Sequence, residues 1–217
     1  MEEEVLGYLC EAIQNIPEHY YTLSNPQGYS KIERHPERLF TYELYHQLRI
    51  IIEKEKKNNS FYDEFFVDAE IYKRIERATY SKEDVTEKKY KETKSELDND
   101  KVFPDLVIHT NQKSRKTNGQ FLILECKTQT ENLNQDAFNN DFFKLNEYIS
   151  LLNFQFSVYL IINKSENDIR NYLNTYKKSY WTSKLGNVIF IVKENYKSKL
   201  KIFDTMLKEI KVAFESR

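Results

Sequence analysis

The sequence predicts an α/β fold in which helices flank a central mixed sheet. Segments with apolar residues at helical spacing alternate along the chain with short runs of β-branched and aromatic residues. From residue 37 to residue 162 the expected order is helix, three strands, helix, strand, which packs helices against a sheet. The chain has 217 residues, and a single domain over residues 1–217 is expected.

Two helices are expected in the first quarter of the chain. Apolar residues recur at helical spacing from Val5 to Ile16, and Pro17 ends the pattern. A second helix is expected from about Pro36 to about Lys57. Its core stripe consists of Phe40, Leu44, Leu48 and Ile51.

The next segments are a strand and a charged stretch. Residues 65–72 alternate between an apolar face and a mixed face, which predicts a strand whose mixed face carries Glu70. Residues 73–101 hold charged side chains at high density and are interpreted as a charged insertion or flap within the domain.

Two apolar runs, residues 102–108 and 121–127, carry charged residues where a buried strand would normally have none. Asp105 lies in the first run, and Glu125 and Lys127 end the second. Asn118-Gly119 favours a tight turn, so we expect an antiparallel hairpin with Asp105 beside Glu125. Strand alternation predicts that one face of the second run is shared by Phe121, Ile123, Glu125 and Lys127.

The chemistry of this hairpin points to a cation site. Two carboxylates that lie close together repel, and their burial is unfavourable unless a cation lies between them. Lys127 supplies one positive charge, and a divalent metal would supply the rest. Glu-x-Lys occurs elsewhere in the chain, but only Glu125-Cys126-Lys127 ends an apolar strand and follows a Pro-Asp pair. The alternative is an ion pair at the end of an edge strand.

The second half of the chain predicts further helices and strands. Asn134 is expected to cap a helix, and residues 155–162 are expected to form a buried strand. Ser165 begins a capping-box sequence that opens another helix. Residues 187–192 are expected to form a strand, and residues 198–214 a final amphipathic helix.

Composition excludes several function classes. The net charge is −1, so any contact with nucleic acid depends on local basic patches. The two cysteines form no CxxC pair, the four histidines lack zinc spacing, and no glycine-rich phosphate loop occurs. No membrane span and no basic signal-peptide start are seen, so a cytoplasmic location is expected. Cys126 is expected to be a buried, inert thiol.

Asp105, Glu125 and Lys127 resemble the motif of the PD-(D/E)xK nuclease superfamily, with Cys126 as its x residue. The resemblance runs from about residue 37 to residue 162 and implies a restriction-endonuclease-like core. Residues 40–49 resemble the first helix of a bacterial branch of that superfamily, where a glutamate, here Glu43, faces the metal. The long charged stretch before Pro104 departs from the pattern.

The resemblance implies a Mg²⁺- or Mn²⁺-dependent endonuclease that hydrolyses phosphodiester bonds, with DNA as the expected substrate. Asp105, Glu125, Glu43 and the backbone carbonyl of Cys126 would be the metal ligands, and Lys127 would orient or deprotonate the attacking water. Two alternatives stay open. One is an RNA-directed nuclease, and the other is a catalytically silent scaffold that binds nucleic acid or protein. A homodimer is also left open.

Further contacts with the substrate are expected around this site. Lys113, Arg115 and Lys116 would either hold a phosphate backbone or guard an exposed sheet edge. The stretch 73–101 would either be solvated surface or close over nucleic acid. Participation in the site is left open for four side chains: Glu70, His109, Asp141 and Lys144.

Overall fold

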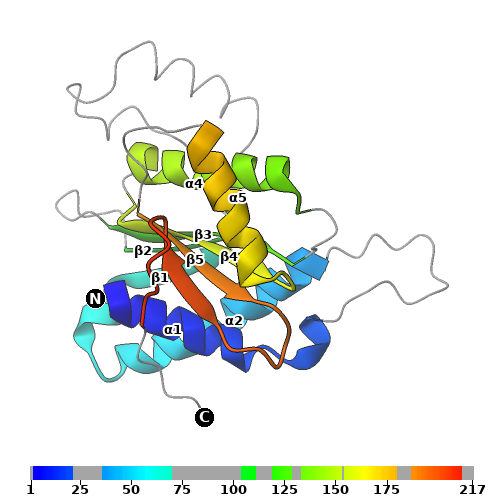
Figure 1. Ribbon diagram of the computed structural model, residues 1–217. Helices are drawn as coiled ribbons and strands as arrows, with labels where there is room; N and C mark the ends of the chain where they lie inside the picture. Colours follow the sequence, from blue (N-terminus) through cyan, green and yellow to red (C-terminus); the bar gives the residue numbers. More distant parts are fainter. Residues whose placement is uncertain are drawn as a thin grey trace, which may run out of the picture.

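The computed structural model describes residues 2–21, 36–69, 104–110, 119–128, 133–152, 154–179 and 187–211. These residues form an α/β fold around one six-stranded mixed sheet, with the strands in the order β1-β2-β3-β4-β5-β6 (Figure 1). The strands are β1 (Phe65–Ala69), β2 (Leu106–Thr110), β3 (Gln120–Lys127), β4 (Phe156–Ile162), β5 (Val188–Lys193) and β6 (Lys201–Asp204).

Helices cover both faces of the sheet (Figure 1). One face packs against α1 (Glu2–Asn15) and α2 (Pro36–Lys56), together with the short helices η1 (Glu18–Tyr20) and η2 (Ser60–Glu64). The other face packs against α4 (Gln135–Leu152) and α5 (Glu166–Ser179). Both helices expected in the first quarter of the chain are therefore present, and the α/β fold is confirmed.

The pairing of the strands brings three strand ends to one edge of the sheet. The strands β1, β2 and β3 pair antiparallel, which confirms the predicted hairpin of β2 and β3. The central strands β3, β4 and β5 pair parallel, and β6 returns antiparallel to β5. Because parallel strands share their direction, Lys127, Ile162 and Lys193 end β3, β4 and β5 at the same edge.

Two helices begin at the caps that the sequence predicts. The Asn134 Oδ1 accepts a hydrogen bond from the backbone N–H of Ala137 at 2.9 Å, at the start of α4. At the start of α5, the Ser165 Oγ accepts from the N–H of Asp168 at 3.2 Å and donates to its carboxylate at 2.8 Å. These bonds satisfy backbone donors that the first turn of a helix leaves without partners.

The predicted position of Phe121 is wrong. The pairing of β2 with β3 shifts register between Ile108 and His109, so the side-chain alternation of β3 is interrupted near its start. Phe121 joins the core on the α1 and α2 side, where its ring lies 4.4 Å from that of Phe65. Ile123 keeps its predicted place on the α4 side.

The final amphipathic helix expected at residues 198–214 is also wrong within the described part of the chain. Lys201–Asp204 instead forms β6 along β5. Ile202 is buried on the α1 and α2 side and Phe203 on the α4 and α5 side. Adjacent buried residues on opposite faces satisfy the two-residue period of a strand, which a one-faced helix cannot do. Residues 212–214 lie outside the described residues.

Several predictions fall outside the described residues. These are the charged stretch 73–101, Glu70, and the basic residues Lys113, Arg115 and Lys116. Among the helices that are described, none is long and apolar enough to cross a membrane.

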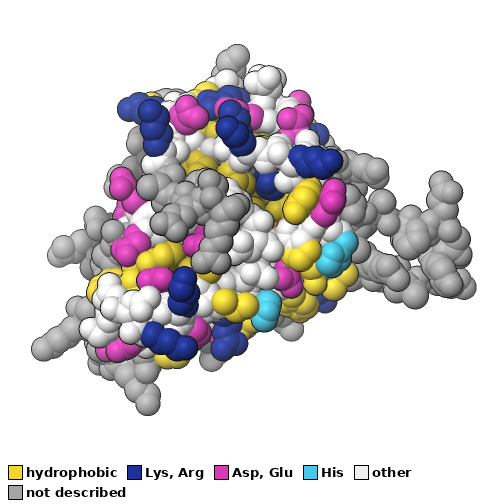
Figure 2. Space-filling view, turned by 90° about the horizontal axis from the view of Figure 1, so that it is seen from below, with side chains coloured by type: hydrophobic (Ala, Val, Ile, Leu, Met, Phe, Trp, Pro, Cys, Tyr) yellow, Lys and Arg dark blue, Asp and Glu magenta, His cyan; other side chains and the backbone are white. Residues whose placement is uncertain are grey.

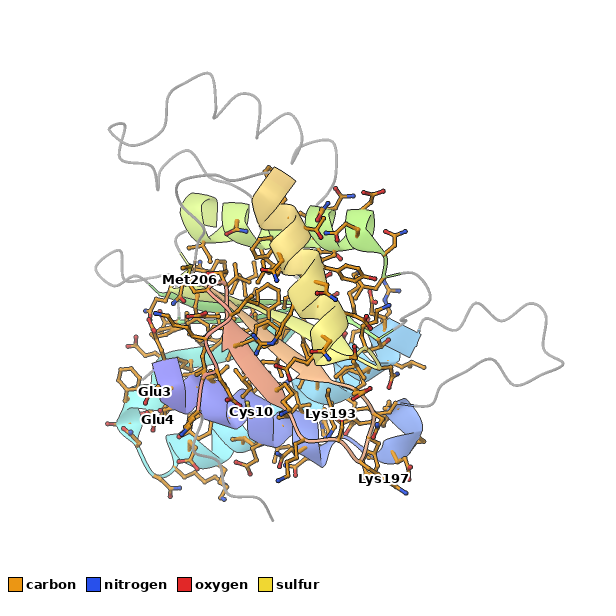
Figure 3. All side chains as sticks on the ribbon, viewed as in Figure 1. Glu3, Glu4, Cys10, Lys193, Lys197 and Met206 are labelled. Atoms are coloured by element: carbon orange, nitrogen blue, oxygen red, sulfur yellow. The ribbon has the colours of Figure 1, made fainter. Side chains whose placement is uncertain are left out.

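Figure 2 shows the molecule from the α1 and α2 side, where acidic, basic and hydrophobic side chains are interspersed. In Figure 3, Cys10 lies on α1 and Lys193 at the end of β5.

Candidate functional site

The end of β3 brings together the three residues of the predicted motif. Asp105 immediately precedes β2, and its Oδ2 accepts a hydrogen bond from the backbone N–H of Cys126 at 2.7 Å. Glu125 and Lys127 are on β3, on either side of Cys126 along the chain. This bond holds the Asp105 carboxylate against the backbone between Glu125 and Lys127, as strand pairing predicts.

Two further carboxylates, from two helices, contact Lys127. Its Nζ lies 3.2 Å from the Oε1 of Glu37, in the first turn of α2, and 3.6 Å from the Oδ2 of Asp141 on α4. Burial of Lys127 lowers its pKa, but Asp141, Glu37, Glu125 and Asp105 together outweigh that effect and raise the pKa above the usual value. Lys127 is therefore held as an ammonium ion.

The two motif carboxylates are poor places for negative charge. Burial, assisted by the charges of Glu37 and Asp141, raises the pKa of Asp105 from 3.8 to about 6, although the bond from Cys126 and the charge of Lys127 oppose the rise. Glu125 is only 8 % exposed. Burial first, and then the charges of Asp105 and Asp141, raise its pKa well above the usual value. A cation at this point would relieve both effects.

A buried tyrosine holds Asp141 in place. Tyr159 lies on β4, directly across from Glu125 in the register of β3 and β4. Its hydroxyl donates a hydrogen bond to the Oδ2 of Asp141 at 3.0 Å. Burial and the charge of Asp141 raise the pKa of this hydroxyl well above its usual value, so it remains a donor. Sequence reasoning left Asp141 open and missed Tyr159, because their contact joins two elements.

The described contacts of Glu43 are with residues outside this cluster. Its Oε1 accepts a hydrogen bond from Gln47 at 2.7 Å, and it lies beside the hydroxyl of Tyr20. Glu37 and Glu43 are six residues apart on α2, which at 3.6 residues per turn puts them about 240° apart around the helix. They therefore face in different directions, and the helix carboxylate beside Lys127 is Glu37. The charge of Glu37 raises the pKa of Asp105, whereas the role of Glu43 as a metal ligand stays a prediction.

A signal for Glu37 was present in the sequence. Continuing the core stripe of α2 backward from Leu44 by three and four residues leads to Thr41 and then to Glu37. The Thr41 hydroxyl lies beside the thiol of Cys126. An acidic residue in the first turn is ordinary at a helix N-terminus, so Glu37 by itself carries no distinctive signal of a site.

Three further residues named in the sequence analysis lie at different distances from the site. Lys144, on α4, lies close enough to Glu125 to lower its pKa slightly against the larger opposing effects. His109 is at the other end of β2 from Asp105, and its Nε2 lies 2.7 Å from the Oδ2 of Asp68. Cys126 is fully buried on the α1 and α2 side, as predicted, and burial raises the pKa of its thiol.

The donor set suits a hard divalent cation. Within the described residues, no group of three or more His, Cys, Asp and Glu side chains forms a ready-made metal cage. Magnesium usually keeps several waters and needs only one or two protein carboxylates, with substrate phosphates completing its shell. Asp105 and Glu125 could supply those two carboxylates, because both are buried oxygen donors with raised pKa values and the charge of Asp105 disfavours that of Glu125.

Comparison with known proteins adds no relative to this description. No protein-family model matches the chain, and no curated protein sequence or solved structure matches it at a significant level.

Proposed function

We propose that this chain is a metal-dependent nuclease of the PD-(D/E)xK type, with a restriction-endonuclease-like core, that hydrolyses phosphodiester bonds of DNA. The observation that carries the proposal is the convergence of Asp105, Glu125 and Lys127 at the end of β3. The element order α2-β1-β2-β3-α4-β4 also agrees with this assignment.

The proposed division of labour follows from charge. Asp105 and Glu125 would hold Mg²⁺ or Mn²⁺, with the backbone carbonyl of Cys126 as a further oxygen donor. When bound, such an ion acidifies water and stabilises negative charge on a phosphate. Lys127 is held as an ammonium ion, so it acts by orienting the attacking water and stabilising charge rather than as the base.

The residues around Lys127 serve to position it. Glu37 and Asp141 contact its ammonium group from α2 and α4, and Tyr159 fixes Asp141. A charged group that is held in place before reaction needs no reorganisation as charge develops on the substrate. Asp105 is likewise oriented by its bond from the N–H of Cys126.

The test is cleavage of supercoiled plasmid, linear duplex, single-stranded DNA and RNA, each with Mg²⁺, Mn²⁺, Ca²⁺ or EDTA. We expect cleavage with Mg²⁺ or Mn²⁺ and none with EDTA or with the Asp105→Asn variant. Asp63→Asn, at an exposed aspartate of η2, is the matched control and should cleave normally. Cleavage of RNA alone would select the RNA-directed alternative. If wild-type protein neither binds Mn²⁺ nor cleaves any substrate, the silent-scaffold alternative replaces the proposal.

A further inference from the structure

An exposed aromatic ring lies on an edge strand of the sheet. The strand β1 is at one end of the strand order, and its Phe65 and Val67 side chains enter the core on the α1 and α2 side. Phe66 points to the other face and remains 42 % exposed. The free energy gained by burying a phenylalanine scales with the apolar area removed from water, so Phe66 forgoes a substantial part of that gain. Its exposure by itself identifies no partner, but its surroundings do.

A second ring supports Phe66 from behind. The imidazole of His109 is stacked on Phe66, with ring centroids 5.9 Å apart and planes 29° apart. Both imidazole nitrogens are engaged, the Nε2 at 2.7 Å from Asp68 Oδ2 and the Nδ1 at 3.0 Å from the carbonyl of Thr110. These two contacts fix the plane of the histidine ring, and the stacked pair is therefore a preorganised flat surface.

A positive charge accompanies this surface. The Nζ of Lys56, from the last turn of α2, lies 5.6 Å from the centroid of the Phe66 ring. It also contacts Glu53 at 2.7 Å, on the same helix. A lysine side chain is flexible, so a planar group that stacks on Phe66 could displace the Lys56 ammonium. The ammonium could then contact an anionic group attached to the stacked one. An aromatic ring beside a mobile cation suits a nucleobase followed by a phosphate.

The surface lies on the same face of the sheet as the candidate site. Asp68 pairs with Val107, and Val107 pairs with Ile123, whose side chain is two positions before Glu125 on β3. Paired residues share a face, so Phe66 and Glu125 both lie on the α4 side. His109 is four residues from Asp105 along the chain, or about 13 Å at the rise of a strand. A few nucleotides of one nucleic-acid strand, at ~3.4 Å of rise per nucleotide, cover the distance from His109 to Asp105.

We propose that Phe66, backed by His109, is a stacking surface for an unpaired base, and that the substrate of the site is therefore single-stranded nucleic acid. This inference rests on the proposed nuclease function and extends it to the class of substrate. A base within a duplex has both faces covered by its neighbours, whereas an unpaired base offers a face to an aromatic side chain. Lys56 meets the phosphate next to the stacked base.

The experiment measures binding without turnover. Fluorescence anisotropy with labelled single-stranded and blunt duplex DNA, in EDTA, compares wild type with Phe66→Ala and Phe66→Trp. The matched control is Phe143→Ala, because Phe143 is 41 % exposed on α4. Stacking of one base is worth about 1–3 kcal/mol, so Phe66→Ala should weaken single-strand binding about 5- to 150-fold. Phe66→Trp should retain it, and Phe143→Ala should bind like wild type.

Equal single-strand binding by wild type and Phe66→Ala would overturn the inference, as would an equal loss in Phe143→Ala or no single-strand binding by wild type. Cleavage measured in parallel separates this failure from failure of the proposed function. If Asp105→Asn loses cleavage while Phe66→Ala binds and cleaves single strands normally, only the stacking surface is refuted. If nothing is cleaved but Phe66→Ala selectively loses single-strand binding, the surface stands and the nuclease proposal fails.

Discussion

The ammonium of Lys127 lies 3.2 Å from the carboxylate of Glu37, although the two residues are 90 positions apart in the chain. This contact joins the end of β3 to the first turn of α2, and Asp141 joins the same ammonium to α4. Three elements therefore meet at one lysine. Four carboxylates surround it (Glu37, Asp105, Glu125 and Asp141). This excess of negative charge would favour a further cation, as the proposed metal site requires.

The first prediction separates cleavage from metal binding. Replacing Lys127 with alanine removes a charge that stabilises the reacting phosphate but leaves Asp105 and Glu125 as oxygen donors. Removing one preorganised stabilising group commonly lowers the rate by about 10²–10³. We expect Lys127→Ala to lose cleavage to that extent while it still binds Mn²⁺ in a calorimetric titration. Asp105→Ala should lose both.

A second strand-end lysine provides the control for this prediction. Lys193 ends β5 (Figure 3) and is 5 % exposed. It donates to the carbonyl of Ser198 at 2.7 Å and lies beside the ring of Tyr21. Burial lowers its pKa. Lys193→Ala should lower the melting temperature and leave the cleavage rate per folded molecule unchanged. Cleavage by Lys127→Ala at the wild-type rate would refute the role given to Lys127.

The second prediction concerns stability and pH. Because the folded-state pKa of Asp105 is raised to about 6 from 3.8, the folded protein holds a proton that the unfolded chain has already released between these values. Stability should fall as pH rises through this window. Each pKa unit corresponds to about 1.4 kcal/mol, so ionised Asp105 destabilises the metal-free fold by on the order of 2–3 kcal/mol. Screening by solvent reduces this value.

Asp105→Asn tests this sign, because the amide oxygen can still accept the bond from Cys126. In metal-free buffer the variant should be more stable than wild type at pH 8, and the difference should shrink steadily toward pH 4. Chemical denaturation across this pH range gives the measurement, with Asp63→Asn as the exposed control. A variant that is less stable than wild type at pH 8 would show that ionised Asp105 does not destabilise the folded protein.

The sequence predicts well those features that depend on local chemistry. The caps at Asn134 and Ser165 each need only a side chain and the backbone N–H three residues further on. The pairing of the motif strands likewise depends on a short connection. In contrast, residues 201–204 are too short a run for periodicity to distinguish strand from helix, and pairing with β5 decides the outcome.

The residues around Lys127 show why the rest of the site was harder to predict. A stripe along α2 identifies the buried face but not which turn of the helix meets the end of β3. Glu37 was therefore overlooked, although it extends that stripe. The bond between Tyr159 and Asp141 depends on how α4 crosses β4, which is a property of packing and not of either segment alone.

The third prediction is stabilisation by metal. A ligand that binds only the folded state at 100 times its dissociation constant adds about 2.7 kcal/mol to the free energy of unfolding. In a domain of this size, that corresponds to a rise of about 5–10 °C in melting temperature. We expect Mn²⁺ to produce such a rise in wild type and little or none in Asp105→Asn or Glu125→Gln. An equal rise in Glu125→Gln would place the metal elsewhere.

The fourth prediction compares two glutamates of one helix. Glu37 contacts Lys127, whereas Glu43 contacts Gln47 and lies beside Tyr20, so substitution by glutamine removes a charge from the site only in the first case. Glu37→Gln should lower the cleavage rate on the order of tenfold, because Asp141 is then the only one of the two contacts of Lys127 that carries a negative charge. Glu43→Gln should cleave like wild type.

The same pair of variants distinguishes positioning from metal ligation. If Glu37 acts only by holding Lys127, Mn²⁺ affinity stays at the wild-type value in Glu37→Gln while kcat falls and KM is little changed. If Glu37 is itself a ligand, the calorimetric affinity for Mn²⁺ falls together with kcat. Loss of activity in Glu43→Gln with full activity in Glu37→Gln would reverse the assignment and restore Glu43 as the helix carboxylate of the site.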